Sequence, residues 1–380
     1  MFERFNLRDN AFPVTPSAQE STPWFGFRLL KREFEAIFHR SSTEQLRLCV
    51  LNRGRLGAGK THAAQYFAAE FARKEPFGTY HSCVSIVIEA PKQPAKAFVE
   101  FTGRLLNEVT FRRIAEASKN LRSLSNADTL FSKLLEATGS EDIATVLSRI
   151  DDANLLTSKA FLLGGGTAKE FRTLGVAKKL TSEHEFASAV VAVLYLLIHG
   201  QSGDRASVSR IALWMDEMED LVYFPTRYYL PFTQALREII DRTNRHLTLM
   251  LNFTFSEPED LPAIENVLGQ AIMQRVNHHV IFQQPTIDDM RDYLLELFKF
   301  NRVDNRGCSV TFPFSPEAFE LLAECAVSKT PRFLNKLCDM LLRDFHDNPN
   351  LDLTNGREIS RDIVQQRLPG VLNLLEEARG

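Results

Sequence analysis

The amino-acid sequence predicts an α/β protein with a parallel-sheet core, a large helical insertion in that core and an all-α C-terminal lid. Short apolar runs alternate with segments of helical periodicity, which is the pattern of a parallel sheet whose strands are joined by helices. Residues 94–205 interrupt this alternation with helical patterns alone. After residue 285 only helical patterns remain. We therefore expect a leader and first helix over 1–44, a core over 45–285 and a lid over 286–380.

The leader, residues 1–23, contains Pro13, Pro16 and Pro23 among polar residues, which favours an irregular segment on the surface. It is charged and has no apolar core of a signal peptide. The apolar residues of 25–40 recur at helical spacing and predict the first helix.

The core strands are predicted from short apolar runs bounded by polar residues. They are expected at 46–51, 83–89, 211–217, 247–255 and 279–282. A strong helical pattern over 61–72 follows the first strand, with a glycine-rich loop between them.

The insertion, residues 94–205, is predicted to be helical with weak breaks at Gly139 and at 164–166. Its apolar run over 186–198 is shorter than the roughly 20 residues of a membrane span, so we expect a buried helix and no membrane association. In the lid, helices are expected near 286–301, 315–327 and 331–346, with a last element at 359–368.

Composition narrows the class of protein. A chain of 380 residues is long enough for two or three compact units. The net charge of −3 excludes the strongly basic character of many nucleic-acid-binding proteins, although a local basic face remains open. The five scattered cysteines form no CxxC pair, which favours free thiols in a reducing, cytoplasmic compartment.

The glycine-rich loop, residues 54–61, reads Gly-Arg-Leu-Gly-Ala-Gly-Lys-Thr and has the strand-before, helix-after context of a phosphate-binding loop (P-loop). Its glycines allow backbone N–H groups to wrap phosphates, and the helix N-terminus favours anions. We expect Lys60 to reach the β- and γ-phosphates of ATP and the Thr61 hydroxyl to bind Mg²⁺. The predicted nucleotide-binding residues are Gly54, Gly57, Ala58, Gly59, Lys60, Thr61 and His62.

Asp216 and Glu217 end the apolar strand predicted over 211–217. Burying a carboxylate at the end of an apolar strand costs free energy unless the charge has a partner. Mg²⁺ is a suitable partner for Asp216. The adjacent Glu217 is then placed to act as general base on the attacking water. The alternative is an acidic N-cap of the following helix. We expect Glu219 and Asp220 to be acids of the first helical turn.

Polar residues at the end of the strand over 247–255 are candidates for sensing the γ-phosphate. They are Asn252, Thr254 and Ser256, of which Asn252 and Thr254 share one face of the strand. The residues alone do not separate these two.

Two arginines are further catalytic candidates. Arg275, ahead of the last predicted strand, is placed to act as an arginine finger towards a neighbouring subunit's γ-phosphate. Arg332 follows Pro331 at the start of a lid helix and is placed to contact bound phosphate. For each of them the alternative is an ordinary surface arginine. His278 and His279 are expected at the surface.

The order of these motifs resembles the AAA+ ATPases. Over roughly 45–90 and 205–345, the P-loop, Asp216-Glu217, the polar strand end, Arg275 and Thr330-Pro-Arg332 look like Walker A, Walker B, sensor 1, arginine finger and sensor 2. The resemblance is greatest to the clade of origin-recognition ATPases, TnsC and ExeA. The opening residues 5–16 are similar to the leader of ExeA-like proteins, which packs near the adenine.

A narrower resemblance concerns the insertion. Three stretches look like the ATPases of BREX phage-defence systems: residues 161–176, which open with Phe-Leu-Leu-Gly-Gly-Gly-Thr, the Leu-Trp-Met-Asp-Glu-Met-Glu-Asp-Leu at 213–221, and Gly-Lys-Thr-His in the P-loop. This chain has no winged-helix pattern after residue 346, so any contact with DNA would move to the insertion. Basic residues there, at 112–113, 119–122, 169–172 and 178–179, form either solvated faces or a track for phosphates.

The resemblance and the motifs together predict an ATPase that uses ATP and Mg²⁺. The leading hypothesis is a homo-oligomer with shared nucleotide sites, acting as a switch or motor with protein partners of a multi-component defence, mobile-element or replication-like complex, and with duplex DNA as a candidate partner. The alternative is a STAND- or ExeA-like signalling ATPase that acts on proteins without DNA. A small-molecule kinase is disfavoured, because it does not need a hydrolytic Glu217.

Overall fold

The computed structural model describes residues 2–8, 11–13, 23–44, 46–72, 83–93, 96–200, 210–255, 261–304, 308–326, 329–347 and 357–377. The chain folds into two compact units. The first comprises residues 1–34, 54–66 and 282–380, and the second comprises residues 35–53 and 67–281. This grouping follows contacts rather than sequence order, and the three-part division expected above stays a prediction.

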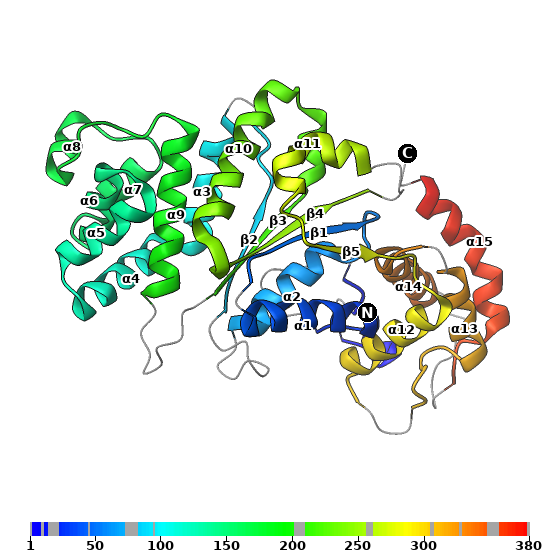
Figure 1. Cartoon of the computed structure of the whole chain (residues 1–380). Helices are drawn as coiled ribbons and strands as arrows, with labels where there is room; N and C mark the ends of the chain where they lie inside the picture. The colour runs from blue at the N-terminus through cyan, green and yellow to red at the C-terminus, as the bar shows by residue number, and fades with distance from the viewer. Residues whose placement is uncertain are drawn as a thin grey trace. The chain divides into compact units, whose positions relative to one another are not determined.

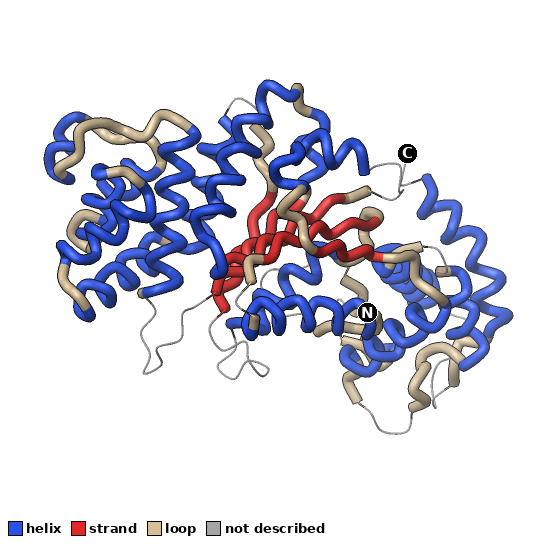
Figure 2. The backbone as a smooth tube through the Cα atoms, viewed as in Figure 1, coloured by secondary structure: helices blue, strands red, loops and turns tan. Residues whose placement is uncertain are grey.

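The second unit is built on a five-stranded sheet, whose strands stand side by side in the tube drawing (Figure 2). The strand order is β2-β3-β4-β1-β5, and the pairs β1–β4, β3–β4 and β2–β3 are parallel. The strands are β1 (Leu48–Gly54), β2 (Cys83–Glu89), β3 (Arg210–Asp216), β4 (Leu247–Phe253) and β5 (His278–Phe282). All five predicted strands are thus confirmed, and with them the α/β fold class.

The sheet is buried on both faces at its centre. Every residue of β3 and β4 is buried, which explains why these strands read as continuous apolar runs. Because parallel strands end at one edge, the carboxyl ends of β1, β3 and β4 lie on the same side of the sheet. The helices α10 (Thr226–Thr243) and α11 (Leu261–Met273) flank β4 in sequence, and the short 3₁₀ helix η4 (Met218–Tyr223) follows β3.

The predicted insertion between β2 and β3 is confirmed as helical over its described part. It contains α3 (Ala97–Val109), α4 (Phe111–Leu124), α5 (Ala127–Thr138), α6 (Glu141–Arg149), α7 (Leu155–Leu162), α8 (Ala168–Leu174) and α9 (Glu183–His199) (Figure 1). The predicted breaks are real: Gly139 caps α5 at φ +67°, and Gly164 has φ +72° after α7. Side chains of Asn126, Ser140, Thr167 and Ser182 cap the helices that follow them.

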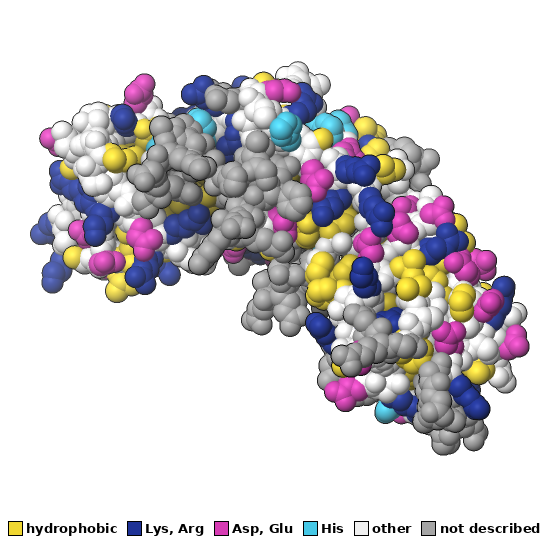
Figure 3. Space-filling view, turned by 90° about the horizontal axis from the view of Figure 1, so that it is seen from below, with side chains coloured by type: hydrophobic (Ala, Val, Ile, Leu, Met, Phe, Trp, Pro, Cys, Tyr) yellow, Lys and Arg dark blue, Asp and Glu magenta, His cyan; other side chains and the backbone are white. Residues whose placement is uncertain are grey.

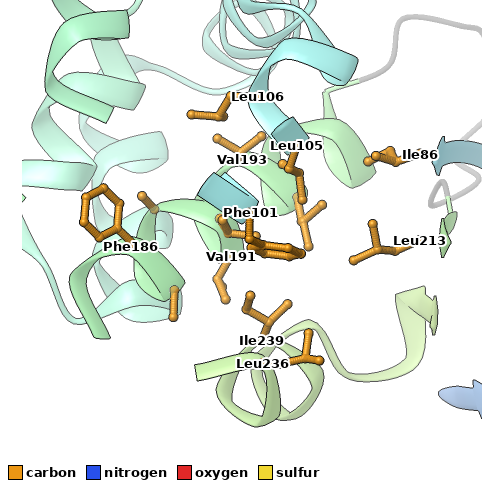
Figure 4. Close-up of a cluster of buried hydrophobic side chains, with 14 of the residues drawn as sticks. Ile86, Phe101, Leu105, Leu106, Phe186, Val191, Val193, Leu213, Leu236 and Ile239 are labelled. Atoms are coloured by element: carbon orange, nitrogen blue, oxygen red, sulfur yellow. The ribbon is translucent and has the colours of Figure 1, made fainter. Parts of the chain in front are cut away.

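Helix α9 carries the longest apolar run and is buried along nearly its whole length. It packs against α3, α10 and β3, so it joins the insertion to the sheet. Figure 4 shows this junction, with Phe101 and Leu105 of α3 beside Val191 and Val193 of α9. No helix within the described residues is both long and apolar enough to cross a membrane.

The first unit contains the C-terminal helices α12 (Ile287–Asn301), α13 (Pro316–Cys325), α14 (Pro331–His346) and α15 (Arg361–Glu377), as predicted. Their core includes leader residues, among them Phe5, Leu7 and Phe12. The expectation that the leader lies on the surface is wrong for these residues, because burying their large apolar side chains stabilises the folded chain. Backbone hydrogen bonds from Arg8 N–H to Asn301 O and from Val303 N–H to Asn6 O fix the segment.

The remaining N-terminal elements are the 3₁₀ helix η1 (Phe2–Phe5) and helices α1 (Arg28–Thr43) and α2 (Lys60–Ala72). Helix α2 matches the predicted 61–72, whereas α1 covers Arg28–Thr43 in place of the predicted 25–40. All five cysteines are free, as expected, and burial raises the pKa of the Cys49 and Cys83 thiols to about 12.

Candidate nucleotide-binding site

The P-loop has the backbone that its glycines predict. Gly57 and Gly59 adopt φ of +80° and +104°, a region that L-residues with a side chain rarely enter. The loop is closed by a hydrogen bond from Ala58 N–H to Arg55 O at 3.1 Å. Among the described residues, no atom lies within 4 Å of a Cβ built on Gly59. The first backbone bond of α2, from Ala63 N–H to Gly59 O at 2.8 Å, starts directly after it.

Lys60 is the first residue of α2 and is only 6% exposed. Its ammonium donates to Gly54 O at 2.8 Å and to Arg55 O at 3.0 Å, so it lies across the loop. Thr61, the next residue, is half-buried.

The lid helix α14 begins beside this loop. A Cβ on Gly57 would lie 2.9 Å from Arg332 Cβ and 3.0 Å from Thr330 Oγ1, so only glycine fits. Thr330 caps α14 by accepting the Phe333 N–H at 3.4 Å, and Pro331 takes the first turn. The structure therefore places the predicted lid arginine, Arg332, at the P-loop.

An aromatic group lies at the first turns of α2. The Trp24 ring centroid is 5.9 Å from that of His62 and 5.4 Å from that of Tyr66. Burial lowers the pKa of His62 to about 4, although a hydrogen bond to the backbone of Pro23 opposes the shift. His62 is therefore neutral at neutral pH and offers a flat, uncharged ring at the phosphate loop.

At the carboxyl edge of the sheet, Asp216 ends β3 and is 6% exposed. Its Oδ1 accepts the Glu217 N–H at 3.1 Å and Asn252 Nδ2 at 3.2 Å. Asn252 Oδ1 in turn accepts from Asn52 Nδ2 at 2.7 Å. This polar chain crosses from β1 through β4 to β3, and it fixes the orientation of the Asp216 carboxylate.

Glu217 adopts φ +56°, an uncommon conformation that ends β3 and starts η4. Its side chain is 44% exposed and its Oε2 lies 2.7 Å from Lys92 Nζ. Glu219 lies in the first turn of η4, as expected, and its Oε2 accepts the backbone N–H of Thr254 at 3.0 Å.

The structure distinguishes the two sensor candidates by position. The Asn252 side chain contacts Asp216, whereas Thr254 contributes a backbone N–H to Glu219. Ser256 lies outside the described residues.

Arg275 stands in the turn between α11 and β5. Its Nε and Nη2 donate to the two carboxylate oxygens of Asp241 at 2.7 and 2.6 Å. The hydrogen bond to Asp241 raises the pKa of Arg275, and the same bond lowers the pKa of Asp241. Within one chain, Arg275 is thus an ion-paired residue. His279 is exposed and His278 partly so.

Two residues of this region were not identified from the sequence. Asn52 is a polar residue inside an apolar strand, and that irregularity was a usable indication. Lys92 follows β2 in an ordinary loop, and nothing in the sequence marks it. Within the described part of the chain, no three His, Cys, Asp or Glu side chains form a metal-ligating group.

Comparisons with known proteins give a fold likeness and no sequence relative. No family model matches the chain, and no curated protein matches it. Among solved structures, the ORC2 protein of Aeropyrum pernix in its ADPNP-ADP complexes is 11% identical with a TM-score of 0.50, over 96% of this chain and 72% of that one.

Two further neighbours are more distant. The Drosophila ORC bound to DNA is 14% identical with a TM-score of 0.45, over 97% of this chain and 65% of that one. The Walker-type ATPase PABY2304 of Pyrococcus abyssi is 14% identical with a TM-score of 0.44, over 97% of this chain and 79% of that one. The five-stranded sheet and the likeness to the Aeropyrum pernix ORC2 protein together show an α/β fold with a parallel-sheet core.

Proposed function

We propose that this chain is an AAA+-type ATPase that binds and hydrolyses ATP. The observation that carries the proposal is the P-loop: two glycines at positive φ, a buried Lys60 across the loop and Arg332 of the lid against Gly57. The likeness to an ORC2 protein solved with ADPNP and ADP supports nucleotide as the ligand.

The roles of the P-loop residues follow from their geometry. The N–H groups of Gly57, Ala58 and Gly59 bind phosphate oxygens, and Lys60 exchanges its carbonyl partners for the β- and γ-phosphates. Gly54 keeps the strand end free of a side chain, since a Cβ there would lie 2.5 Å from Phe282 Cβ. Arg332 stabilises the γ-phosphate charge, and the neutral His62 ring packs on the nucleotide.

We also propose Mg²⁺ as a cofactor of this chain. The Thr61 hydroxyl and the oriented Asp216 carboxylate are hard oxygen ligands, and Mg²⁺ takes one or two such groups with substrate phosphates. The ion, when bound, neutralises charge on the phosphates.

Hydrolysis is then assigned to the carboxyl edge of the sheet. Glu217 accepts a proton from water while the water oxygen bonds to the γ-phosphorus and the bond to the β–γ bridging oxygen breaks, which yields ADP and phosphate. Asn252 orients Asp216 and the water. Thr254 remains the second sensor candidate.

For the biological role, we propose a homo-oligomeric switch or motor with shared sites, in which Arg275 leaves Asp241 to serve a neighbour's γ-phosphate. The partners are proteins of a multi-component complex, and duplex DNA is the candidate nucleic acid.

Exposed basic residues of the insertion alternate with acids on the face in Figure 3, and Lys178 pairs with Glu185 at 2.8 Å. A surface of mixed charge is typical of solvated helix faces and not of a continuous track for phosphates. It favours the alternative of a signalling ATPase that acts on proteins without DNA. The BREX resemblance stays a prediction.

Nucleotide affinity tests the proposal. We expect Lys60→Ala to weaken binding of a fluorescent ATP analogue at least about tenfold, since a hydrogen bond to a charged group contributes roughly 1.5–3 kcal/mol. Arg332→Ala should act in the same direction, while Lys336→Ala, one turn further along α14, should leave affinity unchanged. Wild-type affinity in Lys60→Ala would remove the P-loop assignment.

A further inference from the structure

A small groove opens on the helical insertion, where residues of α3, α4 and α7 meet. Its volume is about 300 Å³, at the small end of the roughly 300–1,000 Å³ of ligand pockets. All of its lining residues belong to the second unit, and none of them is a residue of the candidate nucleotide-binding site. The groove therefore has space for one or two side chains of another molecule and needs an explanation other than nucleotide binding.

The groove has an apolar floor and an apolar rim. Leu106 and Phe111 line it and are only 1% and 8% exposed, so they form the floor. Leu156 of α7 also lines it and is 81% exposed, which places this leucine at the rim. A strongly exposed leucine beside an apolar hollow is typical of a surface that binds an apolar side chain of a partner.

One cation stands over the apolar floor. The ammonium of Lys159 lies 5.3 Å from the centroid of the Phe111 ring. Within the described part of the chain, Lys159 forms no ion pair. Glu108 at the end of α3 and Asp152 ahead of α7 are exposed, and neither lines the groove. Lys159 is thus available to a carboxylate that enters the groove from outside.

The N-terminus of α4 adds positive potential at the same place. Its first turn carries Arg112 and Arg113 and no acid. The first N–H groups of a helix have no partner within the helix and favour anions. Because α4 starts at Phe111 on the floor of the groove, its N-terminus and Lys159 favour the same kind of group.

The backbone between α3 and α4 is held in an unusual conformation. Thr110 lines the groove with φ +65° and ψ 135°, which a β-branched residue rarely adopts. Its N–H donates to Leu106 O at 3.1 Å, and its Oγ1 accepts the Arg113 N–H at 3.4 Å. Strained residues of this kind persist where the surrounding fold imposes them, and they cluster at ligand sites. These two bonds fix the N-terminus of α4 beside the groove.

We propose that this groove docks a short segment of a partner protein that carries a large apolar side chain next to a carboxylate. The apolar side chain packs on Leu106 and Phe111 and against Leu156 at the rim. The carboxylate pairs with Lys159 and lies near the N-terminus of α4. The inference goes beyond ATP hydrolysis, since it uses no residue of the nucleotide-binding site.

The chemistry of the groove favours a protein segment over a nucleic acid. Phosphates would satisfy Lys159, but a nucleic acid brings no aliphatic side chain for the floor. Recognition of single-stranded bases relies on exposed aromatic rings. Phe111 is the one aromatic side chain among the described lining residues, and it is buried beneath Lys159.

Peptide selection on the full chain tests the proposal. A display library of short random peptides is selected on the wild-type chain, and binding of the labelled peptides is then measured by fluorescence anisotropy. We expect the selected peptides to share a large apolar residue beside Asp or Glu. Lys159→Glu should weaken their binding at least about tenfold, because an attractive charge contact becomes repulsive. Leu156→Asp should act in the same direction.

The matched controls are Lys119→Glu and Leu124→Asp, which change an exposed lysine and an exposed leucine of α4 that do not line the groove. Both should bind the peptides as the wild type does. Peptides with Lys in place of the acid should bind Lys159→Glu more tightly than they bind the wild type.

Two results contradict the proposal at the level of binding. They are a selection without a shared apolar and acidic pair, and equal binding by Lys159→Glu and its control. Sedimentation supplies a third: loss of self-association in Leu156→Asp alone would assign the groove to a second copy of this chain and overturn the proposal of a different partner.

Discussion

At the scale of single residues, the polar chain Asn52–Asn252–Asp216 is the most specific feature of the sheet. Both asparagines have no exposed surface. Burying an amide in an apolar sheet costs free energy unless its hydrogen bonds are made. The bonds of 2.7 and 3.2 Å that run towards Asp216 show where these two amides are used. We infer that the two amides orient one carboxylate.

Replacing the two sensor candidates should therefore have different effects. Asn252→Ala should lower kcat about 10- to 100-fold, as is typical when the partner that orients a metal-binding group is removed. Thr254→Val should change kcat little, because Thr254 contributes its backbone N–H. Steady-state ATP hydrolysis measures both. Equal losses in the two variants would contradict the assignment of Asn252.

The residues that sequence could identify are those in local motifs. Gly57, Gly59 and Lys60 lie within one loop, so their spacing alone predicts a phosphate site. Lys92 and Asn52 could not be given roles, because their partners are 125 and 200 positions away and meet them only through the strand register. The pairing of Arg275 with Asp241 was missed for the same reason.

At the scale of elements, periodicity predicted all five strands and the lid helices, and the differences lie at their ends. The strand expected over 247–255 stops at Phe253, because the Thr254 N–H bonds to Glu219 and leaves the ladder. The first strand starts at Leu48 and continues to Gly54, directly into the P-loop. Helical spacing predicted that the insertion is helical, but it did not predict where each helix begins. Those starts are set by N-cap residues such as Ser140 of α6 and Ser182 of α9.

Helix α3 supplies a test of the junction between the insertion and the sheet. Phe101→Ala should lower the free energy of unfolding by about 3–5 kcal/mol, the usual cost of deleting a buried Phe side chain. Val99→Ala, on the exposed side of the same helix, should cost well under 1 kcal/mol. Urea unfolding followed by circular dichroism gives both values. A small loss in Phe101→Ala would mean that the junction is not closely packed.

At the scale of the whole molecule, the sequence could not predict the strand order, since β4 lies between β1 and β3 only in space. Nor could it predict that leader residues such as Phe5 complete the core of the lid helices. Both facts depend on contacts between segments far apart in the chain. The resemblance to AAA+ proteins predicted the fold class correctly, but it did not predict these particular contacts.

The role of Arg275 is a question about the assembly. If Arg275 serves a neighbouring subunit, Arg275→Ala should lower turnover about 1,000-fold, a typical effect for an arginine finger. A mixture of Arg275→Ala and Glu217→Gln chains should then be more active than either alone, because each Glu217→Gln chain lends its Arg275 to a site with an intact base. A mixture no more active than its components would assign Arg275 to the ion pair with Asp241.

The central claim is that Glu217 activates water at a P-loop site, and one comparison tests it most directly. ATP turnover and binding of a fluorescent ATP analogue are measured for the wild-type chain and for Glu217→Gln. The account predicts that the variant binds the analogue as the wild type does and loses about 100-fold or more in turnover, since general-base catalysis contributes that much. Unchanged turnover in Glu217→Gln would contradict it.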